Sequence, residues 1–154
     1  MYEKIKSLAK QYYPETVAIR RDLHKYPEQG WLEMRTASLV AKKLEKLGYQ
    51  VLIGKEIMCE EYRMGVPDQE ILESNYQRAI SQGADPYYIK KVKDGFTAVA
   101  GILKNGSGPV VAIRFDMDAL CIEEDDSINH NPGKFGPATA PLPAAQHGSP
   151  QAHA

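Results

Sequence analysis

Two aspartates in the second half of the chain have the type and spacing best suited to chemistry. Asp116 and Asp118 lie two residues apart, directly after a predicted β-strand. In open α/β sheets, functional groups gather where strands end at their carboxyl edge. Two carboxylates in such a turn could position a divalent metal, a metal-bound histidine or a cationic group of a substrate. The alternative is structural, because aspartate often caps a turn with its own side chain, and the spacing alone leaves both interpretations open.

Other polar residues give weaker signals. Cys121, close to the aspartate pair, is interpreted as a small buried apolar residue. His24, near the end of a predicted helix, is expected to bond to a backbone carbonyl or to interact with the helix dipole. An acidic run and three histidines of the polar C-terminal stretch are interpreted as solvated surface: Glu123, Glu124, Asp125, Asp126, His130, His147 and His153.

Helices are predicted mainly in the first half of the chain. Apolar residues at helical spacing predict one helix near residues 5–12 and a second that opens at Pro14 and ends before Pro27. The strongest pattern covers residues 32–47, and Gly48 follows it as a left-handed cap. Its expected buried stripe consists of Leu32, Thr36, Leu39, Val40, Leu44 and Leu47.

Strands and a polar insertion are expected next. Residues 49–53 predict a short strand. The polar region 54–94 predicts helices, one capped by Asp68 and ended by Gly83, and another beginning at Asp85-Pro86. The runs 96–103 and 110–115 predict two strands joined by the turn of residues 104–109, as a hairpin or an adjacent strand pair.

Composition narrows the class of protein. Nineteen basic and twenty acidic side chains give a formal charge of -1, which argues against nucleic acid or an anionic membrane as the partner. No apolar run approaches the roughly 20 residues of a membrane span. Two cysteines do not make a disulfide framework, so we expect a cytoplasmic setting. Residues 129–154 are rich in Pro, Gly and Ala and are expected to form an irregular tail.

Four segments, in this order, resemble the amidohydrolase branch of the M20 metallopeptidase family. The helical insertion at about 55–94 is most similar to the aminobenzoyl-glutamate hydrolase A-subunit type within that branch. The matching segments are Arg20-Arg21-Asp22-Leu23-His24 with Pro27-Glu28, Thr36 to Val51, Gly95-Phe96-Thr97 with Val99-Ala100, and Val111 to Leu120.

The resemblance implies an α/β fold, the N-terminal part of a zinc-peptidase-like catalytic domain with helices packed on a mixed sheet, here incomplete. The domain would span residues 1–128. The resemblance further implies hydrolysis of the amide bond of a small N-acyl or aminobenzoyl amino acid by a divalent metal centre of zinc, manganese or cobalt. Asp118 matches the acid that supports a metal-binding group. Asp116 occupies the position where other branches place a metal-binding histidine, and structural roles are expected for Arg20, Arg21 and His24.

One departure from the family pattern bears on activity. The family carries a His-Ala-Cys-Gly-His-Asp-Gly-His motif, which supplies a cysteine and a histidine ligand, where this chain has residues 146–154 without cysteine. We therefore expect an N-terminal fragment that is inactive alone, binds metal weakly and forms homo- or hetero-oligomers. The alternative is a non-catalytic interaction or regulatory fragment that pairs with a full-length relative.

Overall fold

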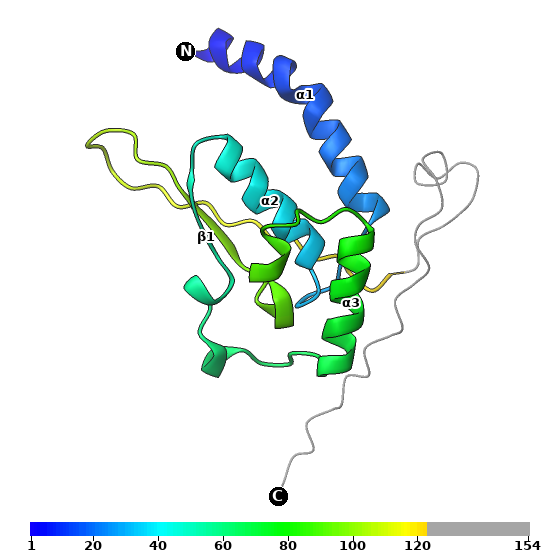
Figure 1. Cartoon of the computed structure of the whole chain (residues 1–154). Helices are drawn as coiled ribbons and strands as arrows, with labels where there is room; N and C mark the ends of the chain where they lie inside the picture. Colours follow the sequence, from blue (N-terminus) through cyan, green and yellow to red (C-terminus); the bar gives the residue numbers. More distant parts are fainter. Residues whose placement is uncertain (123–154) are drawn as a thin grey trace, which may run out of the picture. The chain divides into compact units, whose positions relative to one another are not determined.

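A computed structural model describes residues 1–122 of the chain (Figure 1). The chain divides into two compact units, which are treated separately below. One unit is Pro27–Ala119, and the other includes Met1–Tyr26. Three features expected from the sequence lie outside the described residues, namely the acidic run 123–126, the tail 129–154, and the histidines within it.

The N-terminal segment is one helix, α1 (Tyr2–Lys25), rather than the two predicted stretches. Pro14 lies inside it, although proline has no N–H to donate to the carbonyl four residues earlier and costs about 3 kcal/mol in a helix interior. Helix-forming residues on both sides of Pro14 propagate the helix through this break. The predicted end of the helix before Pro27 is confirmed.

Helix α2 (Met34–Lys46) confirms the strongest helical pattern, and Gly48 follows it with φ of 84°. The predicted buried stripe is only partly right. Leu32 and Thr36 are buried, but Leu47 is 56% exposed. The fully buried positions of the helix include Ala37, Ser38 and Ala41, because small side chains let α2 lie close to its neighbours.

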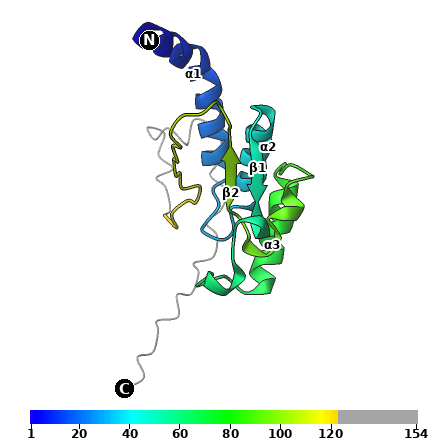
Figure 2. The same cartoon turned by 90° about the vertical axis from the view of Figure 1, so that its left-hand side faces the viewer.

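The sheet of the described residues consists of β1 (Gln50–Ile53) and β2 (Val99–Ile102). They pair antiparallel, with Ile53 opposite Val99. Helix α2 packs on this pair with α3 next to it (Figure 2). The expected mixed sheet is thus represented in residues 1–122 by one antiparallel pair.

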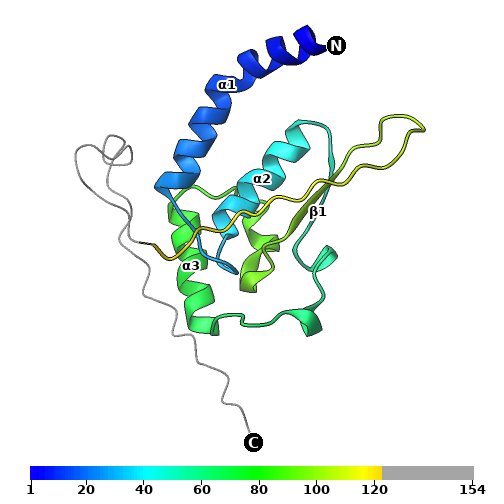
Figure 3. The ribbon, with the colours of Figure 1, turned by 180° about the vertical axis from the view of Figure 1, so that it is seen from behind.

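The predicted hairpin of 96–103 with 110–115 is wrong. Strand β2 pairs with β1 instead, and residues 110–115 form no strand in the part of the chain that the structure describes. Figure 3 shows the chain leaving β2, turning back through an extended loop and continuing without regular structure. β-Propensity alone does not make a strand, because a strand also needs a neighbour for its backbone groups.

The insertion contains α3 (Gln69–Ser81) and four 3₁₀ turns among the described residues, η1 (Gly54–Glu56), η2 (Glu60–Tyr62), η3 (Ile89–Lys91) and η4 (Lys93–Gly95). Asp68 precedes α3 as predicted, but its side chain accepts no capping hydrogen bond from the helix. Asp85 caps the turn after it, since its Oδ1 accepts hydrogen bonds from the backbone N–H groups of Tyr87 and Tyr88, both at 3.0 Å. The predicted helix after Asp85 is therefore the short turn η3.

The core of this unit lies between α2, α3 and the sheet. Its largest fully buried side chains are Phe96, Met34 and Ile53. No helix within residues 1–122 combines the length and apolar character needed to cross a membrane.

Candidate functional site

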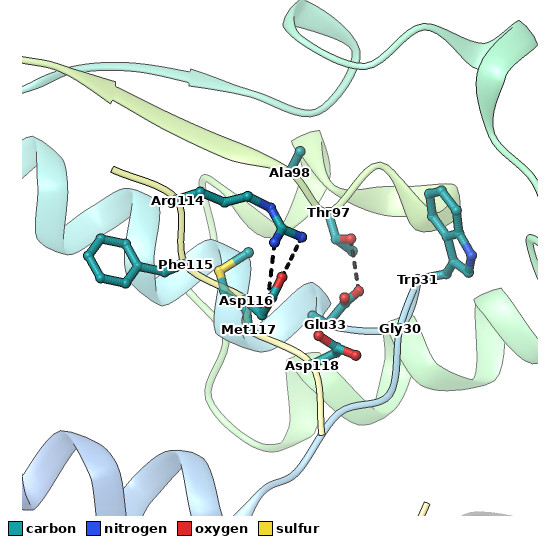
Figure 4. Close-up of a pocket in the computed structure, with 10 residues that line it drawn as sticks. All are labelled: Gly30, Trp31, Glu33, Thr97, Ala98, Arg114, Phe115, Asp116, Met117 and Asp118. Carbon is teal, nitrogen blue, oxygen red and sulfur yellow. Dashed lines mark hydrogen bonds and ion pairs between the residues drawn. The ribbon is translucent and has the colours of Figure 1, made fainter. Parts of the chain in front are cut away.

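A cavity of about 300 Å³ in the unit Pro27–Ala119 brings the two predicted aspartates together. Three segments line it: the loop before α2, the entry to β2, and the segment of both aspartates (Figure 4). The lining residues are Gly30, Trp31, Glu33, Thr97, Ala98, Arg114, Phe115, Asp116, Met117 and Asp118. No pattern in the sequence predicts that the first two segments lie beside the third.

Glu33 and Asp118 form an acidic pair in this cavity. Thr97 Oγ1 donates a hydrogen bond of 2.8 Å to Glu33 Oε2. Burial raises the pKa of the Glu33 carboxyl, and the charge of nearby Asp118 adds to this rise, while the Thr97 hydrogen bond opposes it. A Cβ on Gly30 would lie 3.9 Å from Asp118 Oδ2, an ordinary contact distance, so the loop before α2 lies beside that carboxylate.

Asp116 is engaged by a neighbouring cation. Arg114 Nη2 lies 2.5 Å from Asp116 Oδ1, and these side chains are 84% and 64% exposed. A metal bound by Asp116 would therefore have to displace Arg114 or share the Asp116 carboxylate with it.

Oxygen donors such as Asp118, Glu33 and Asp116 suit a hard divalent cation. Within residues 1–122, however, no group of three or more His, Cys, Asp or Glu side chains could hold a metal ion. The described residues therefore fit a supporting part of a metal centre, and do not fit a complete set of ligands.

Glu28 holds the segment of Asp118 in place. Its carboxylate is 1% exposed and accepts hydrogen bonds from the backbone N–H groups of Arg35 (3.0 Å) and Thr36 (2.7 Å) at the start of α2. Arg78 Nη2 of α3 lies 3.4 Å from the same carboxylate. The Glu28 carbonyl accepts a 2.7 Å hydrogen bond from the N–H of Ala119, the residue after Asp118. One residue thus joins α2, α3 and the aspartate segment.

Sequence reasoning missed the roles of Glu33, Thr97 and Glu28. Thr97 and Glu28 lie in segments that carry the family resemblance, which was the available signal. Cys121 was expected to be buried, and this expectation is wrong: Cys121 is exposed, as are Leu120 and Ile122 on either side of it. Arg20, Arg21 and His24 lie on α1, in the other unit.

The raised pKa of Glu33 predicts a pH-dependent effect of Glu33→Gln. The folded state holds the Glu33 proton more tightly than the unfolded chain, whose carboxyl has the ordinary value of 4.5. The contribution of Glu33 to the free energy of unfolding is therefore fully present below pH 4.5. It is lost as pH rises through the folded-state pKa of Glu33. Urea unfolding should show Glu33→Gln gaining stability relative to wild type from pH 4.5 upward.

Glu56→Gln is the opposing control. The N–H of Ile53 donates to Glu56 Oε2 at 3.0 Å, and this bond lowers the pKa of Glu56. This control should therefore lose stability relative to wild type as pH rises from the folded pKa of Glu56 to 4.5, and the difference should stay constant above pH 4.5. Parallel pH profiles for both variants would contradict the assignment of Glu33.

Comparisons with known proteins show what the chain is similar to. No protein-family model matches the chain. It is 41% identical over 135 residues to the A-subunit of p-aminobenzoyl-glutamate hydrolase from Escherichia coli, covering 87% of this chain and 31% of that protein. It is 44% identical over 124 residues to indole-3-acetyl-aspartic acid hydrolase of Enterobacter agglomerans, covering 80% of this chain and 28% of that protein.

The chain is also similar to a solved structure. The crystal structure of an aminobenzoyl-glutamate utilization protein from Klebsiella pneumoniae superposes with a TM-score of 0.73 at 42% identity, over 75% of this chain and 30% of that protein. The chain thus spans less than a third of the length of these relatives. By sequence and by fold, it is homologous to the M20 amidohydrolases over that part of their length.

Proposed function

We propose that the chain contributes the carboxylate-lined part of a metal-dependent amidohydrolase centre. Its substrate would be an N-acyl or aminobenzoyl amino acid, whose amide bond is hydrolysed. The observation that carries the proposal is the placement of Asp118 beside Glu33 in a cavity of a chain related to two such hydrolases. Asp118 supports a metal-binding group in this proposal, Asp116 is a further oxygen ligand, and residues 1–128, with the insertion at 55–94, belong to the catalytic domain.

Zinc, manganese or cobalt would supply the chemistry by lowering the pKa of a bound water and polarising the amide carbonyl. The chain's own residues would hold and orient the centre: Glu28 fixes the backbone after Asp118, and Thr97 fixes Glu33. We further propose that the 154 residues alone are inactive and bind metal weakly. Two observations support this: Arg114 forms an ion pair with Asp116, and within residues 1–122 no group of three or more His, Cys, Asp or Glu side chains could hold a metal ion.

A chimera tests the proposed function. The matching stretch of the Enterobacter agglomerans hydrolase would be replaced by the homologous stretch of this chain, and hydrolysis of indole-3-acetyl-aspartate would be measured with added zinc or manganese. The chimera is expected to hydrolyse this compound. Asp118→Asn within it should lower kcat/KM by about 10- to 100-fold, which is typical when a group that orients a metal ligand is lost.

The matched control is Glu61→Gln, which changes an exposed carboxylate outside the cavity and should leave kcat/KM unchanged. A folded chimera without activity, or equal activities of the Asp118 and Glu61 variants, would overturn the proposal. The unmodified 154-residue chain should release no product under the same conditions.

A second candidate function is non-catalytic pairing with a full-length relative. It is favoured by the exposed apolar side chains of residues 110–115 that follow β2. Co-expression with the Klebsiella pneumoniae relative tests it. Co-purification that Ile113→Lys abolishes would support this function, and separate elution of the two proteins would count against it.

A further inference from the structure

Trp31 is a large aromatic residue that lines the candidate site without belonging to the core. Its side chain is only partly buried. In the part of the chain that the structure describes, the partly buried apolar side chains that pack on the core include Met117 but not Trp31. The next residues of the same loop, Leu32 and Met34, are 5% and 0% exposed. The loop thus turns Leu32 and Met34 into the core and leaves the indole of Trp31 at the cavity.

The backbone holds Trp31 in a conformation that tryptophan rarely adopts. Its φ is 70°, in the left-handed region that favours glycine. The N–H of Leu32 donates a 2.9 Å hydrogen bond to the carbonyl of Gln29, which makes Trp31 the third residue of a four-residue turn. A positive φ at that position favours glycine, yet the glycine of this turn is Gly30, one position earlier. Backbone strain of this kind clusters at sites that hold ligands, where the surrounding structure fixes it.

Contacts with the entry to β2 fix this turn. A Cβ on Gly95 would lie 3.3 Å from the carbonyl oxygen of Trp31, so the two backbone segments lie close together. Two residues after Gly95, Thr97 donates its 2.8 Å hydrogen bond to Glu33, two residues after Trp31. The indole is therefore attached to a backbone that is already ordered, which reduces the entropy lost when a ligand packs against the ring.

The surroundings of the indole indicate which part of a ligand it would contact. Figure 4 shows Glu33 and Asp118 between Arg114 and the indole of Trp31. Within residues 1–122 the indole stacks on no other ring, so it offers an apolar surface on which a planar aromatic group can stack. In an N-acyl amino acid, the amino-acid part carries a carboxylate, which Glu33 and Asp118 would repel. The acyl part is uncharged and suits this end of the cavity.

We propose that Trp31 binds the aromatic acyl group of an N-acyl amino acid by ring stacking, and thereby sets a preference for aromatic over aliphatic acyl groups. The inference rests on the proposed function for its substrate class. It assigns Trp31 a role in binding and specificity, and no role in the hydrolysis itself.

Titration of the isotope-labelled 154-residue chain with N-benzoyl-glutamate and N-acetyl-glutamate, followed by NMR, tests this inference. Trp31 is the single tryptophan of the sequence, so its indole Nε1–H gives one side-chain signal. N-benzoyl-glutamate should shift this signal and the backbone signals of Glu33 and Thr97, with a Kd on the order of millimolar. N-acetyl-glutamate should bind about tenfold more weakly, because it lacks the ring that stacks on the indole.

Three variants separate stacking from folding, which circular dichroism checks for each. Trp31→Gly removes the ring and keeps the turn, since glycine adopts a φ of 70° without strain. It should bind both ligands as weakly as wild type binds N-acetyl-glutamate. Trp31→Phe keeps an aromatic ring and should retain most of the preference. Tyr62→Leu is the matched control, because it removes an 81% exposed aromatic side chain outside the cavity and should leave both affinities unchanged.

Three outcomes would overturn the inference: equal affinities of wild type for the two ligands, an indole signal that does not move at about 10 mM N-benzoyl-glutamate, or a preference that survives in Trp31→Gly. The hydrolase proposal fails separately, in the chimera. An inactive chimera together with binding that depends on Trp31 would remove the hydrolysis and leave the aromatic site. An active chimera without such binding would remove the aromatic site alone.

Discussion

Replacing Glu28 by alanine is expected to lower the free energy of unfolding of Pro27–Ala119 by about 3–5 kcal/mol, as for other broken buried ion pairs. The carboxylate is 1% exposed and accepts the backbone N–H groups of Arg35 and Thr36. Without it these donors lose their partner at the start of α2, and the partly buried guanidinium of Arg78 loses its counter-charge. Urea unfolding followed by circular dichroism measures the change.

Two variants calibrate this prediction. Glu28→Gln keeps one side-chain oxygen acceptor and should lie between wild type and Glu28→Ala. Glu45→Ala removes a carboxylate from an exposed ion pair with Lys42 and should change stability little. A Glu28→Ala protein that unfolds at the wild-type urea concentration would show that the buried carboxylate does not hold α2 and α3 together.

Gly54→Ala is expected to destabilise the same unit by about 3–5 kcal/mol, from left-handed strain and backbone displacement combined. Gly54 follows β1 with φ of 65°, and its N–H donates a 3.0 Å hydrogen bond to the carbonyl of Ala98. A Cβ at this position would lie 2.2 Å from the carbonyl oxygen of Lys91. Because that atom belongs to the backbone, the whole turn around Lys91 would have to move.

Gly48→Ala is the matched control. Gly48 has φ of 84°, but a Cβ there would meet no atom within 4 Å. This substitution should therefore cost only the left-handed strain, about 1–2 kcal/mol. Equal losses of stability in the two variants would contradict the close approach of Gly54 to Lys91.

Local sequence patterns predicted the helices. They failed for the sheet, where pairing between segments far apart in the sequence determines the structure. Helices α2 and α3, with their following glycines Gly48 and Gly83, could be predicted because periodicity and left-handed caps are local signals. The partner of β2 could not be predicted. The turn after β2 favoured residues 110–115, yet β1, nearly 50 residues earlier in the sequence, pairs with it.

The candidate site shows the same limit. The spacing of Asp116 and Asp118 identified one side of the cavity. Glu33 and Thr97 complete it from positions 64 residues apart in the sequence, and no local pattern links them. The role of Glu28 could not be predicted from local charge either. A single glutamate after a proline does not indicate that its carboxylate is buried or that it contacts two helices.

The most direct test of the central claim is Mn²⁺ titration of the isotope-labelled chain, with paramagnetic broadening of backbone NMR signals as the readout. The claim is that Asp118 belongs to a part of a metal centre that the chain alone does not complete. It predicts weak binding, on the order of millimolar, with broadening centred on Asp118 and Glu33 and lost in Asp118→Asn. Broadening that is unchanged in Asp118→Asn, or tight stoichiometric binding, would contradict the claim.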